Sequence, residues 1–580
     1  MARSTEEIWC ADFETTKKDC RVWAWAACNV NDTAQMEYGH SMDSFMEWCA
    51  RGNNKKIYMH NLRFDGEFVN SYLLFNGYQF CTDRKLCTSK SFTALINDGG
   101  KWFSIDVYFA RGGHHTSKVQ FLDSIKILNF SVEKIAEDFH LPMQKLHMDY
   151  DKDRPLGYEM DEDEKAYITN DVKIVATALQ AVFETGFDGM TIGSSAMKYY
   201  YKLHPEMDKL FPKLPPEVDE DLRQAYRGGF TYVNEKYLDV EIGAGMTFDV
   251  NSMYSSIMRD MPMPYGQPIY FEGQYEEDAT FPLYVQQISC AFELKEGKLP
   301  CVQACHLMGH ADKVYLDSSG GQIYAMTMTS VDLKLFLENY VTFDLQYIGG
   351  WKFRAMTGMF TDYIDIFARK KKQAKKRHDY VRYYMAKQYL NSFVGKFATR
   401  PLGRRKIPYL DKNGVVQYKV GELREIKTLY APVTIFTNAY ARDKVIRTAE
   451  KIREFGIKHH GYDAFVYSDT DSISCLLPAE DLNELRKIIH ISAYDLGAWK
   501  LETVFKSAKY LRGKAYYLET LDNTLKVKVS GLPAKISAQI KKEDFHRGWK
   551  TDTLESTDKK LTKVRVKGGV ILVDTEYTLK

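Results

Sequence analysis

Hydrophobic positions follow two different periods over about the first 190 residues, as in a domain that mixes strands and helices. Ile8-Trp9-Cys10-Ala11 is an apolar run that predicts a strand leading into Asp12-Phe13-Glu14. Farther along, Ile168, Val172, Val175, Leu179 and Val182 recur at steps of three and four and predict an amphipathic helix. The acidic run at 161–164 favours the start of that helix, because negative charge stabilises a helix N-terminus.

The pattern changes between Gly186 and Gly193, where we place the end of this first α/β domain. A proline-rich patch follows at 211–216. Phe248-Asp249-Val250 then predicts a short strand that ends where a helix begins, at Asn251-Ser252. Residues from about 261 to 362 are rich in proline, glycine and tyrosine and predict mixed strands and loops.

The following segment predicts one long helical stretch from about Tyr363 to Phe397, with a basic run at 369–372. Residues 398–430 return to a strand-and-turn pattern, in which Asp411-Lys412-Asn413-Gly414 is a hairpin signal. From Lys509 onward the chain has 16 Lys and Arg against 9 Asp and Glu, so its C-terminal section is basic.

The length of 580 residues is too great for a single core and predicts about three to five domains. The chain is 45% hydrophobic and 27% charged, and it contains no apolar run near the ~18 residues that span a membrane. The N-terminus has no signal-peptide pattern. We therefore expect a monomer without a membrane partner in the cytoplasm, that of a bacterial host if a phage encodes the chain.

The ten cysteines are scattered without paired spacing, which favours reduced thiols. Cys301, Cys305, His306 and His310 could be drawn as a zinc site. Their spacing fits no standard pattern of zinc ligands, so we do not expect zinc at this position.

The net charge of +2 conceals an uneven distribution of charge. Residues 1–191 carry 21 Lys and Arg against 29 Asp and Glu, whereas the remainder carries 58 against 48. Binding of nucleic acid requires only local positive charge, so the small net charge does not exclude it. The acidic first section is typical of a metal-binding nuclease domain, although solvated surface charge would look the same.

Phosphoryl transfer between nucleotides commonly uses two divalent cations held by carboxylates from separate elements. Asp12 and Glu14 project to one face of the predicted strand, because side chains alternate along a strand. Asp65 follows, and Asp171 lies one helical turn after Tyr167. Each fragment alone is compatible with surface charge, but the ordered set predicts a metal-dependent nuclease site.

A second set of chemically suitable residues lies in the rest of the chain. Asp249 ends a predicted strand, and Asp469 and Asp471 lie in a tight acidic turn between two strand runs. Lys387 and Asn391 are four residues apart on a helix, so one helical face offers a cation and an amide to a triphosphate. A structural turn capped by acidic residues is the alternative, which the upstream Asp249 disfavours.

The first set resembles that of the DnaQ-like proofreading exonucleases, and the whole chain resembles the protein-primed branch of the family B DNA polymerases. The resemblance implies a multidomain α/β protein, with a DnaQ-like (RNase H-like) exonuclease domain before a right-hand polymerase of palm, fingers and thumb with two insertions. The matching segments are Tyr226-Arg227-Gly228-Gly229, Asp249 to Tyr254, Lys387 to Gly395, Tyr467 to Ser472, Lys514-Ala515-Tyr516 and Gly568 to Asp574.

The domain boundaries follow from this resemblance. It implies an exonuclease domain (1–191), a first palm part (192–260), an insertion that contacts the terminal protein and DNA (261–362), fingers (363–397), an insertion for processivity and strand displacement (398–430), a second palm part (431–529) and a thumb (530–580).

The resemblance also implies roles for individual residues in the first set. Tyr167 positions the attacking water, Lys145 is the catalytic lysine of the exonuclease, and the carboxylates of Asp12, Glu14, Asp65 and Asp171 hold the metal ions. The single-stranded DNA set consists of His60, Asn61, Phe64, Ser124 and Tyr150.

In the second set, the resemblance implies that Asp249, Asp471 and the Val250 carbonyl bind metal and that Asp469 assists them. The implied nucleotide-binding residues are Tyr254, Lys371, Lys387 and Asn391. The implied DNA-binding residues are Tyr226, Gly228, Gly229, Ser252, Lys514 and Tyr516. Each site is expected to take two Mg²⁺ ions, which Mn²⁺ could replace.

One position departs from the family pattern. The family's helix motif has a tyrosine where this chain has Val394, and that aromatic ring packs against the nascent base pair. Its loss affects the expected nucleotide affinity and base discrimination. The fingers segment is also a few residues longer than the family pattern, so Lys371 has an alternative interpretation as one solvated charge in a basic run.

Taken together, the sequence predicts a DNA polymerase with a 3′→5′ proofreading exonuclease. The expected partners are primed or single-stranded DNA, dNTPs and a terminal protein that primes a linear viral genome, with processive, strand-displacing synthesis. Three alternatives remain: a polymerase of the same branch that starts without a protein primer, a nuclease whose polymerase half is a degenerate DNA-binding module, and a non-enzymatic single-strand-binding protein.

Overall fold

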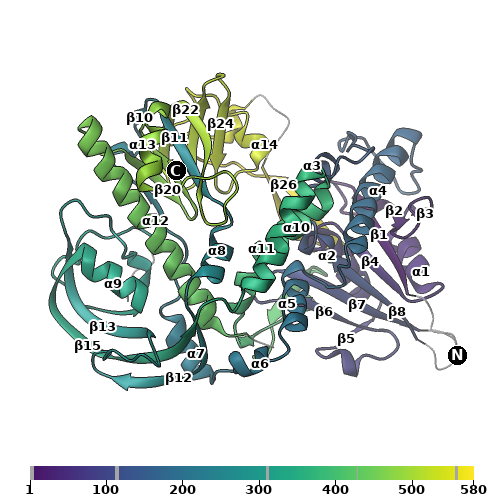
Figure 1. Ribbon diagram of the computed structural model, residues 1–580. Coiled ribbons are helices and arrows are strands. Elements are labelled where there is room, and N and C mark those ends of the chain that lie inside the picture. The colour runs from purple at the N-terminus through teal and green to yellow at the C-terminus, as the bar shows by residue number, and fades with distance from the viewer. Residues whose placement is uncertain (1–5, 111–115, 308–312, 427–428, 555–559) are drawn as a thin grey trace.

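The computed structural model describes residues 6–110, 116–307, 313–426, 429–554 and 560–580. Two eight-stranded sheets organise the described chain, one near each end of the sequence. Figure 1 shows the N-terminal sheet on one side of the molecule and the second sheet on the other, with helices α10 (Thr361–Lys376) and α11 (Tyr380–Phe397) between them.

The N-terminal sheet has the strand order β3-β2-β1-β4-β8-β7-β6-β5. Its centre is formed by β1 (Glu7–Thr15), β4 (Lys55–Met59) and β8 (Thr116–Asp123), which run parallel and are mostly buried. The parallel strands therefore end at one edge of the sheet, where α2 (Leu62–Phe75) begins directly after β4. The outer strands are β2 (Val22–Asn29), β3 (Met36–Gly39), β5 (Gln79–Phe80), β6 (Ser91–Ile96) and β7 (Trp102–Ala110).

Helix α4 (Glu162–Glu184) is the amphipathic helix that the sequence predicts. The Asp161 side chain accepts a hydrogen bond from Glu164 N at 2.9 Å, and Asp161 N donates to Glu164 Oε2 at 3.1 Å, which forms a capping box. The apolar stripe of α4 is buried and the helix packs against β1 and β2. This packing brings α4 to the same region as the end of β1.

The second sheet has the order β24-β23-β22-β11-β21-β20-β9, and β10 (Glu241–Ile242) also pairs with β22. Its central strand β11 (Gly245–Val250) leads into α8 (Met253–Asp260), as the sequence predicts. The predicted acidic turn joins β20 (Phe465–Asp469) and β21 (Ser472–Cys475), which pair antiparallel. The remaining strands are β9 (Thr231–Val233), β22 (Trp499–Arg512), β23 (Ala515–Thr520) and β24 (Leu525–Val529).

A third, four-stranded sheet lies within residues 261–362. The strand order of this sheet is β12-β15-β13-β14. Helix α9 (Ser330–Asn339) lies between β14 and β15 in the chain, and the prediction of strands and loops missed it. The strands of the sheet are β12 (Met263–Glu272), β13 (Leu283–Leu294), β14 (Tyr324–Thr329) and β15 (Tyr340–Met356).

The predicted single helical stretch at 363–397 is wrong in one respect, because the chain turns back after α10 and forms two packed helices. His378 in the turn has a left-handed backbone (φ 54°). The Asp379 side chain accepts a hydrogen bond from Arg382 N at 3.0 Å and caps α11. Polar cap residues that interrupt a basic, helix-favouring run are weak signals in the sequence alone.

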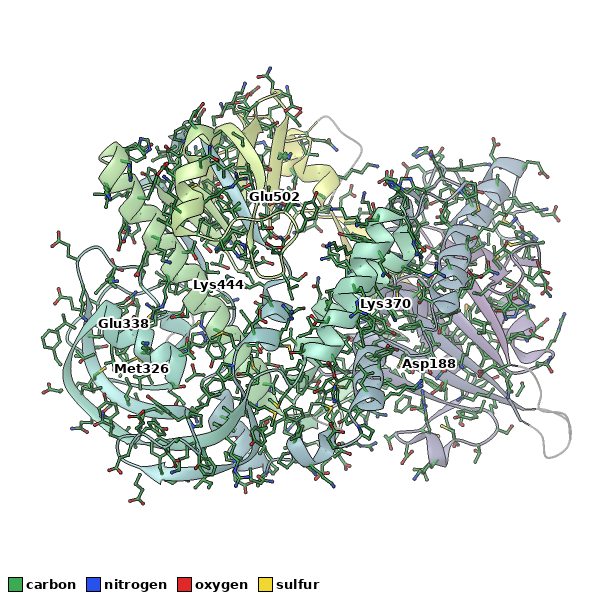
Figure 2. The ribbon with its side chains drawn as sticks, in the orientation of Figure 1. Asp188, Met326, Glu338, Lys370, Lys444 and Glu502 are labelled. Atoms are coloured by element: carbon green, nitrogen blue, oxygen red, sulfur yellow. The ribbon has the colours of Figure 1, made fainter. Side chains whose placement is uncertain are left out.

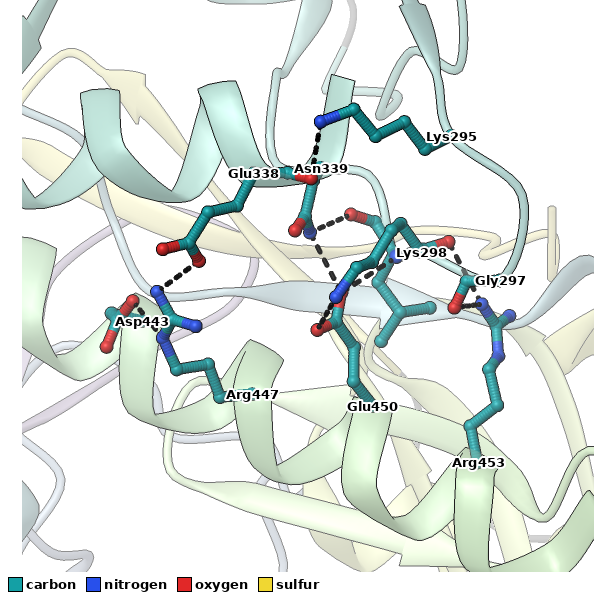
Figure 3. Close-up of polar contacts among 10 residues, drawn as sticks. Lys295, Gly297, Lys298, Glu338, Asn339, Asp443, Arg447, Glu450 and Arg453 are labelled. Atoms are coloured by element: carbon teal, nitrogen blue, oxygen red, sulfur yellow. Dashed lines mark hydrogen bonds and ion pairs between the residues drawn. The ribbon is translucent and has the colours of Figure 1, made fainter. Parts of the chain in front are cut away.

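The longest helix, α12 (Ala431–His460), was not predicted. It contacts α8, α9, α11, β12 and β20, so it is buried on several sides and lacks a clear polar face. Glu450 on α12 is buried beneath the third sheet: its Oε1 accepts from Asn339 Nδ2 at 2.8 Å and Leu299 N at 3.2 Å, and Lys298 pairs with its Oε2 at 3.2 Å (Figure 3). Arg447 pairs with Glu338 and with Asp443, each at 2.7 Å.

Two hairpins complete the fold. The predicted turn at Asp411 to Gly414 joins β17 (Lys406–Leu410) and β18 (Val416–Val420), and β25 (Leu561–Val566) pairs with β26 (Gly569–Asp574) near the C-terminus. Both hairpins contact α2 of the N-terminal domain. No helix in the described part of the chain combines the length and the apolar character needed to cross a membrane.

Candidate active sites

The four carboxylates of the first predicted set come from three elements that meet at one edge of the N-terminal sheet. Asp12 follows Ala11, the last residue of β1 that pairs with β4, and Glu14 lies two residues farther on. Asp65 lies in the first turn of α2, and Asp171 lies on α4. The structure therefore brings the predicted set together, because β1 and β4 run parallel and end side by side.

Burial raises the pKa of each of these carboxyl groups, and repulsion by neighbouring carboxylates raises it further for Asp12, Glu14 and Asp65. The pKa of Asp12 rises from 3.8 to about 7, first through burial and then through the nearby charge of Asp171. Burial is also the main cause for Glu14, Asp65 and Asp171, and repulsion by Asp12 raises the first two further. Asp65 Oδ1 and Asp171 Oδ1 are buried and have no hydrogen-bond partner among the described residues.

Lys145 and two tyrosines surround Asp171. Lys145 forms an ion pair with Asp171, and its Nζ lies 4.9 Å from the centre of the Tyr167 ring. The Tyr167 and Tyr150 hydroxyls lie 2.8 Å apart, and burial raises the pKa of both phenols. Tyr150 is exposed, so a polar chain runs from the surface to Asp171.

Four of the predicted single-strand-binding residues, His60, Asn61, Phe64 and Ser124, lie around the start of α2. His60 Nε2 donates to Phe130 O at 2.7 Å, and His60 Nδ1 lies 2.9 Å from Ser124 Oγ. Asn61 has a left-handed backbone (φ 75°) directly before α2, and Phe64 is partly exposed in the first turn of that helix.

Asp123 is a positioning residue that the sequence analysis missed. It ends β8, and its Oδ1 accepts hydrogen bonds from Asn61 N at 3.2 Å and Leu62 N at 3.3 Å. Asp123 thereby caps the first turn of α2, from which Asp65 projects. The sequence does show an aspartate at the end of a strand run. Its role could be recognised only once β8 was known to be the neighbour of β4.

The second site lies where β11 meets the turn between β20 and β21. Asp249 pairs across the sheet with Ser472, and Val250 N donates to Asp471 O at 2.8 Å. Thr470 in the turn has a left-handed backbone (φ 65°), and Asp471 N donates to Asp469 O at 2.8 Å. The register thus places Asp249 beside Asp471, although 222 positions separate them in the printed numbering.

Burial and nearby negative charge raise the pKa of both Asp249 and Asp471. The pKa of Asp249 rises from 3.8 to about 6, through burial first and then repulsion by Asp471 and Glu502. Burial raises the pKa of Asp471, with a further contribution from Asp469 and Glu502. Glu502 on β22 (Figure 2) is a further carboxylate near this site that the sequence analysis missed. An isolated glutamate on a strand carries no motif that would single it out.

Asp469 has partners of its own. Its Oδ1 lies 3.0 Å from Lys514 Nζ and accepts a hydrogen bond from Thr231 Oγ1 at 3.1 Å. Lys514 N also donates to the Tyr467 hydroxyl at 3.0 Å. Tyr516, two residues later, stacks against Tyr510 with ring centres 5.3 Å apart. The structure therefore places the predicted Lys514 and Tyr516 next to the acidic turn.

The segment Tyr226-Arg227-Gly228-Gly229 lies against the same turn. A Cβ added to Gly229 would lie 2.7 Å from Thr470 Cγ2 and 3.0 Å from Thr470 Cα, so only glycine permits this approach. Arg442 on α12 anchors the segment by donating to Arg227 O at 2.9 Å and Gly228 O at 2.8 Å. Arg442 is itself held by a buried bidentate ion pair with Asp332 of α9. Tyr226, at the start of the segment, is exposed.

The cations predicted to bind a triphosphate face the second site from α10 and α11. Lys371 Nζ donates to Ser252 Oγ at 3.2 Å, directly after β11, which favours the site over the solvated alternative. Burial and the neighbouring Lys387 lower the pKa of Lys371. Lys387 and Asn391 are exposed, and burial raises the pKa of Tyr254 to about 12. The neighbouring positive charges of Lys371 and Lys387 favour the binding of an anion at this position.

Val394, at the departure from the family pattern, is buried in α11. Its carbonyl accepts a hydrogen bond from Thr434 Oγ1 of α12 at 2.8 Å. The residue therefore packs in the core between α11 and α12, and its side chain offers no ring to a base pair.

Both sites have the donor set of a hard divalent cation, namely carboxylate oxygens. Within the described residues, no group of three or more His, Cys, Asp or Glu side chains is arranged closely enough to hold a metal ion. His310 lies outside the described residues. The unpartnered oxygens of Asp65 and Asp171 and the raised pKa values nevertheless fit cation binding, because a cation would relieve the repulsion.

The metal-free protein is expected to lose stability as the pH rises from about 4 to about 7. The folded state raises the pKa of Asp12 from 3.8 to about 7, so the unfolded state releases this proton more readily. The contribution of Asp12 to stability is complete below the unfolded pKa and is lost as the pH passes the folded one. Calorimetry in EDTA should show the decline, and added Mg²⁺ should raise the unfolding temperature more at about pH 8 than at about pH 5.5.

The control for this prediction is Asp12→Asn, which removes the titrating group. Its metal-free stability should vary less with pH than that of the unchanged protein. An equally steep profile in Asp12→Asn would show that other groups cause the decline.

Comparisons with known proteins agree with this geometry. Residues 47–483 match the family model described as DNA polymerase type B, organellar and viral. The DNA polymerase of Bacillus phage phi29 is 38% identical over 601 aligned residues, covering 100% of both chains. The DNA polymerase of Streptococcus phage Cp-1 is 28% identical and covers 98% of both.

Solved structures give the same result. The phi29 DNA polymerase complexed with primer-template DNA and incoming nucleotide substrates has a TM-score of 0.89 to this chain at 36% identity. The match covers 99% of this chain and 100% of that one. The phi29 DNA polymerase complexed with single-stranded DNA matches with the same TM-score, 0.89.

Proposed function

Because the chain belongs to the organellar and viral type B DNA polymerases, we propose that it replicates a linear phage genome from a terminal-protein primer, with proofreading and strand displacement. It is a DNA-directed DNA polymerase of the phi29 type with 3′→5′ exonuclease activity, and it is a multidomain α/β protein. DNA, dNTPs and divalent metal ions belong to this activity.

The observation that best supports the proposal is the presence of two separate carboxylate sites on two sheets. One site carries Asp12 and Asp171, and the other carries Asp249 and Asp471. Two chemically opposed reactions on one DNA end require two centres, and each set here has its own cations and aromatic rings nearby.

In synthesis, Asp249, Asp471 and the Val250 carbonyl would hold the metal ions, and Asp469 and Glu502 would add negative charge. We propose Mg²⁺ as the physiological ion, two in each site, with Mn²⁺ as a substitute. When bound, such ions activate the attacking oxygen and stabilise charge on the leaving oxygen.

The remaining residues of the synthesis site orient the substrates. Lys371 on α10 and Lys387 and Asn391 on α11 bind the triphosphate, and Tyr254 contacts the sugar and excludes a 2′-hydroxyl. Lys514 and Tyr516 bind the primer end, because they lie directly against the acidic turn. Ser252 links the nucleotide cations to the strand that carries Asp249.

In degradation, Asp12, Glu14, Asp65 and Asp171 hold metal, and Tyr167 orients the attacking water. Lys145 balances the charge of Asp171 and approaches the scissile phosphate. His60, Asn61, Phe64, Ser124 and Tyr150 bind the single-stranded 3′ end. Tyr226, Gly228 and Gly229 guide that end between the two sites, since their segment touches the acidic turn.

We propose the same domain division as the sequence resemblance implies. The exonuclease domain covers 1–191, the palm 192–260 and 431–529, the fingers 363–397 and the thumb 530–580. The insertion at 261–362 contacts the terminal protein, and the insertion at 398–430 closes around DNA and supports strand displacement.

Protein priming is tested by supplying a candidate terminal protein with the enzyme, Mg²⁺ and one labelled dNTP. The expected result is one nucleotide attached covalently to a hydroxyl-bearing residue of that protein, followed by its extension. The Asp249→Ala variant is the control and should give no label. Full extension of DNA primers without labelling of the correct terminal protein would favour a polymerase that starts without a protein primer.

A further inference from the structure

The C-terminal hairpin β25–β26 is docked on the exonuclease domain along α2. A Cβ added to Gly569 would lie 2.5 Å from the Phe68 ring, and Val570 is buried in the core of the exonuclease domain. Arg565 Nε lies 3.0 Å from Oε1 of the buried Glu67. Backbone contact, apolar burial and an ion pair therefore fix the position of this hairpin relative to α2.

The spacing of the two elements decides what β25 presents to the exonuclease site. Lys563 and Arg565 project to the same face of β25, because side chains alternate along a strand. Phe64 and Glu67 are three apart on α2 and are neighbours on one helical face. With Arg565 on Glu67, Lys563 lies one turn closer to the start of α2, and its Nζ is 5.2 Å from the centre of the Phe64 ring.

Lys563 is partly buried, whereas Lys567 in the same hairpin is exposed. The ammonium of Lys563 forms no hydrogen bond or ion pair with any residue that the structure describes, and its side chain is only partly exposed. Asp65, Glu67 and Asp123 attract its charge from α2 and β8, whereas Arg63 repels it and burial disfavours it. A partly desolvated cation without a close partner beside an aromatic ring is suited to a phosphate.

We propose that Lys563 is part of the exonuclease site and binds a backbone phosphate of the single-stranded 3′ end while a base contacts Phe64. The residue that completes the nuclease site thus comes from the opposite end of the chain. The inference rests on the proposed assignment of Asp12, Asp65 and Phe64 to that site. It predicts that degradation depends on the docked hairpin, whereas nucleotide addition at Asp249 does not.

The experiment compares Lys563→Gln with the unchanged enzyme on a labelled single-stranded oligonucleotide without dNTPs. The KM for degradation should rise about tenfold, with kcat changed less than about twofold, since a phosphate contact contributes mainly to binding. The salt dependence of log KM should decrease by about 0.7 for one lost phosphate contact. Lys563→Arg should restore most of the affinity, because it keeps the charge.

The matched control is Lys567→Gln in the same hairpin, whose Nζ lies 6.0 Å from the Phe75 ring at the far end of α2. It should leave KM and the salt dependence unchanged. An unchanged KM in Lys563→Gln, or an equal loss of affinity for annealed primer-template in extension assays, would overturn the proposal. If Asp12→Ala with Asp65→Ala still degrades DNA, the site itself is misplaced, which is a separate failure.

Discussion

Replacement of Asp249 by alanine is expected to reduce primer extension by at least about 10³-fold and to leave degradation of single-stranded DNA within about twofold. Asp249 and Asp471 are the carboxylates whose mutual repulsion calls for a cation. Loss of the metal ions raises the activation free energy by several kcal/mol, because the charge of the transition state is no longer stabilised. Each ~1.4 kcal/mol lowers the rate tenfold. Asp471→Ala should behave in the same way.

The measurement is dNTP incorporation on a primed template, beside release of nucleotides from a labelled single strand. Glu480→Ala is a suitable control, because Glu480 is an exposed carboxylate near the same sheet. Extension at a normal rate by Asp249→Ala would mean that the metal ions bind elsewhere.

The double substitution Asp12→Ala with Asp65→Ala should have the opposite effect. Degradation is expected to fall by at least about 10³-fold, while extension of a matched primer stays within about twofold. The physical reason is distance in the fold: Asp12 and Asp65 lie on β1 and α2 of the N-terminal domain, and β11 and the acidic turn belong to the second sheet. A primer with a mismatched 3′ end should then be extended without prior trimming.

Release of label from the single strand and extension of matched and mismatched primers measure this outcome. Glu159→Ala is the control, since Glu159 is an exposed carboxylate of the same domain. Loss of both activities in the double variant, with an unchanged unfolding temperature, would contradict two independent centres.

The fold explains why the two centres are separate and yet connected. Arg442 on α12 holds the carbonyls of Arg227 and Gly228, and the next residue, Gly229, touches Thr470 of the acidic turn. The C-terminal hairpin follows the second sheet in sequence but docks on α2 of the first domain. These contacts join the segment 226–229 to the acidic turn and the C-terminal hairpin to the first domain.

The sequence pattern was sufficient for elements whose signals are local. The apolar run leading into Asp12, the amphipathic stripe of α4 and the turn at Asp411 to Gly414 all correspond to observed elements. The break at His378 and the buried helix α12 were not predicted. A helix that is buried on several sides has no polar stripe, and a turn inside a basic run changes little in composition.

By itself, the sequence determined which residue types could perform phosphoryl transfer and in what order they follow, because carboxylate chemistry and the spacing within one strand or helix are local. Only the tertiary structure decided which residues share a site. Asp123 beside α2, Glu502 beside Asp249 and Lys563 over Phe64 depend on strand neighbours and on docked elements. Those contacts join positions far apart in the chain, where local periodicity carries no information.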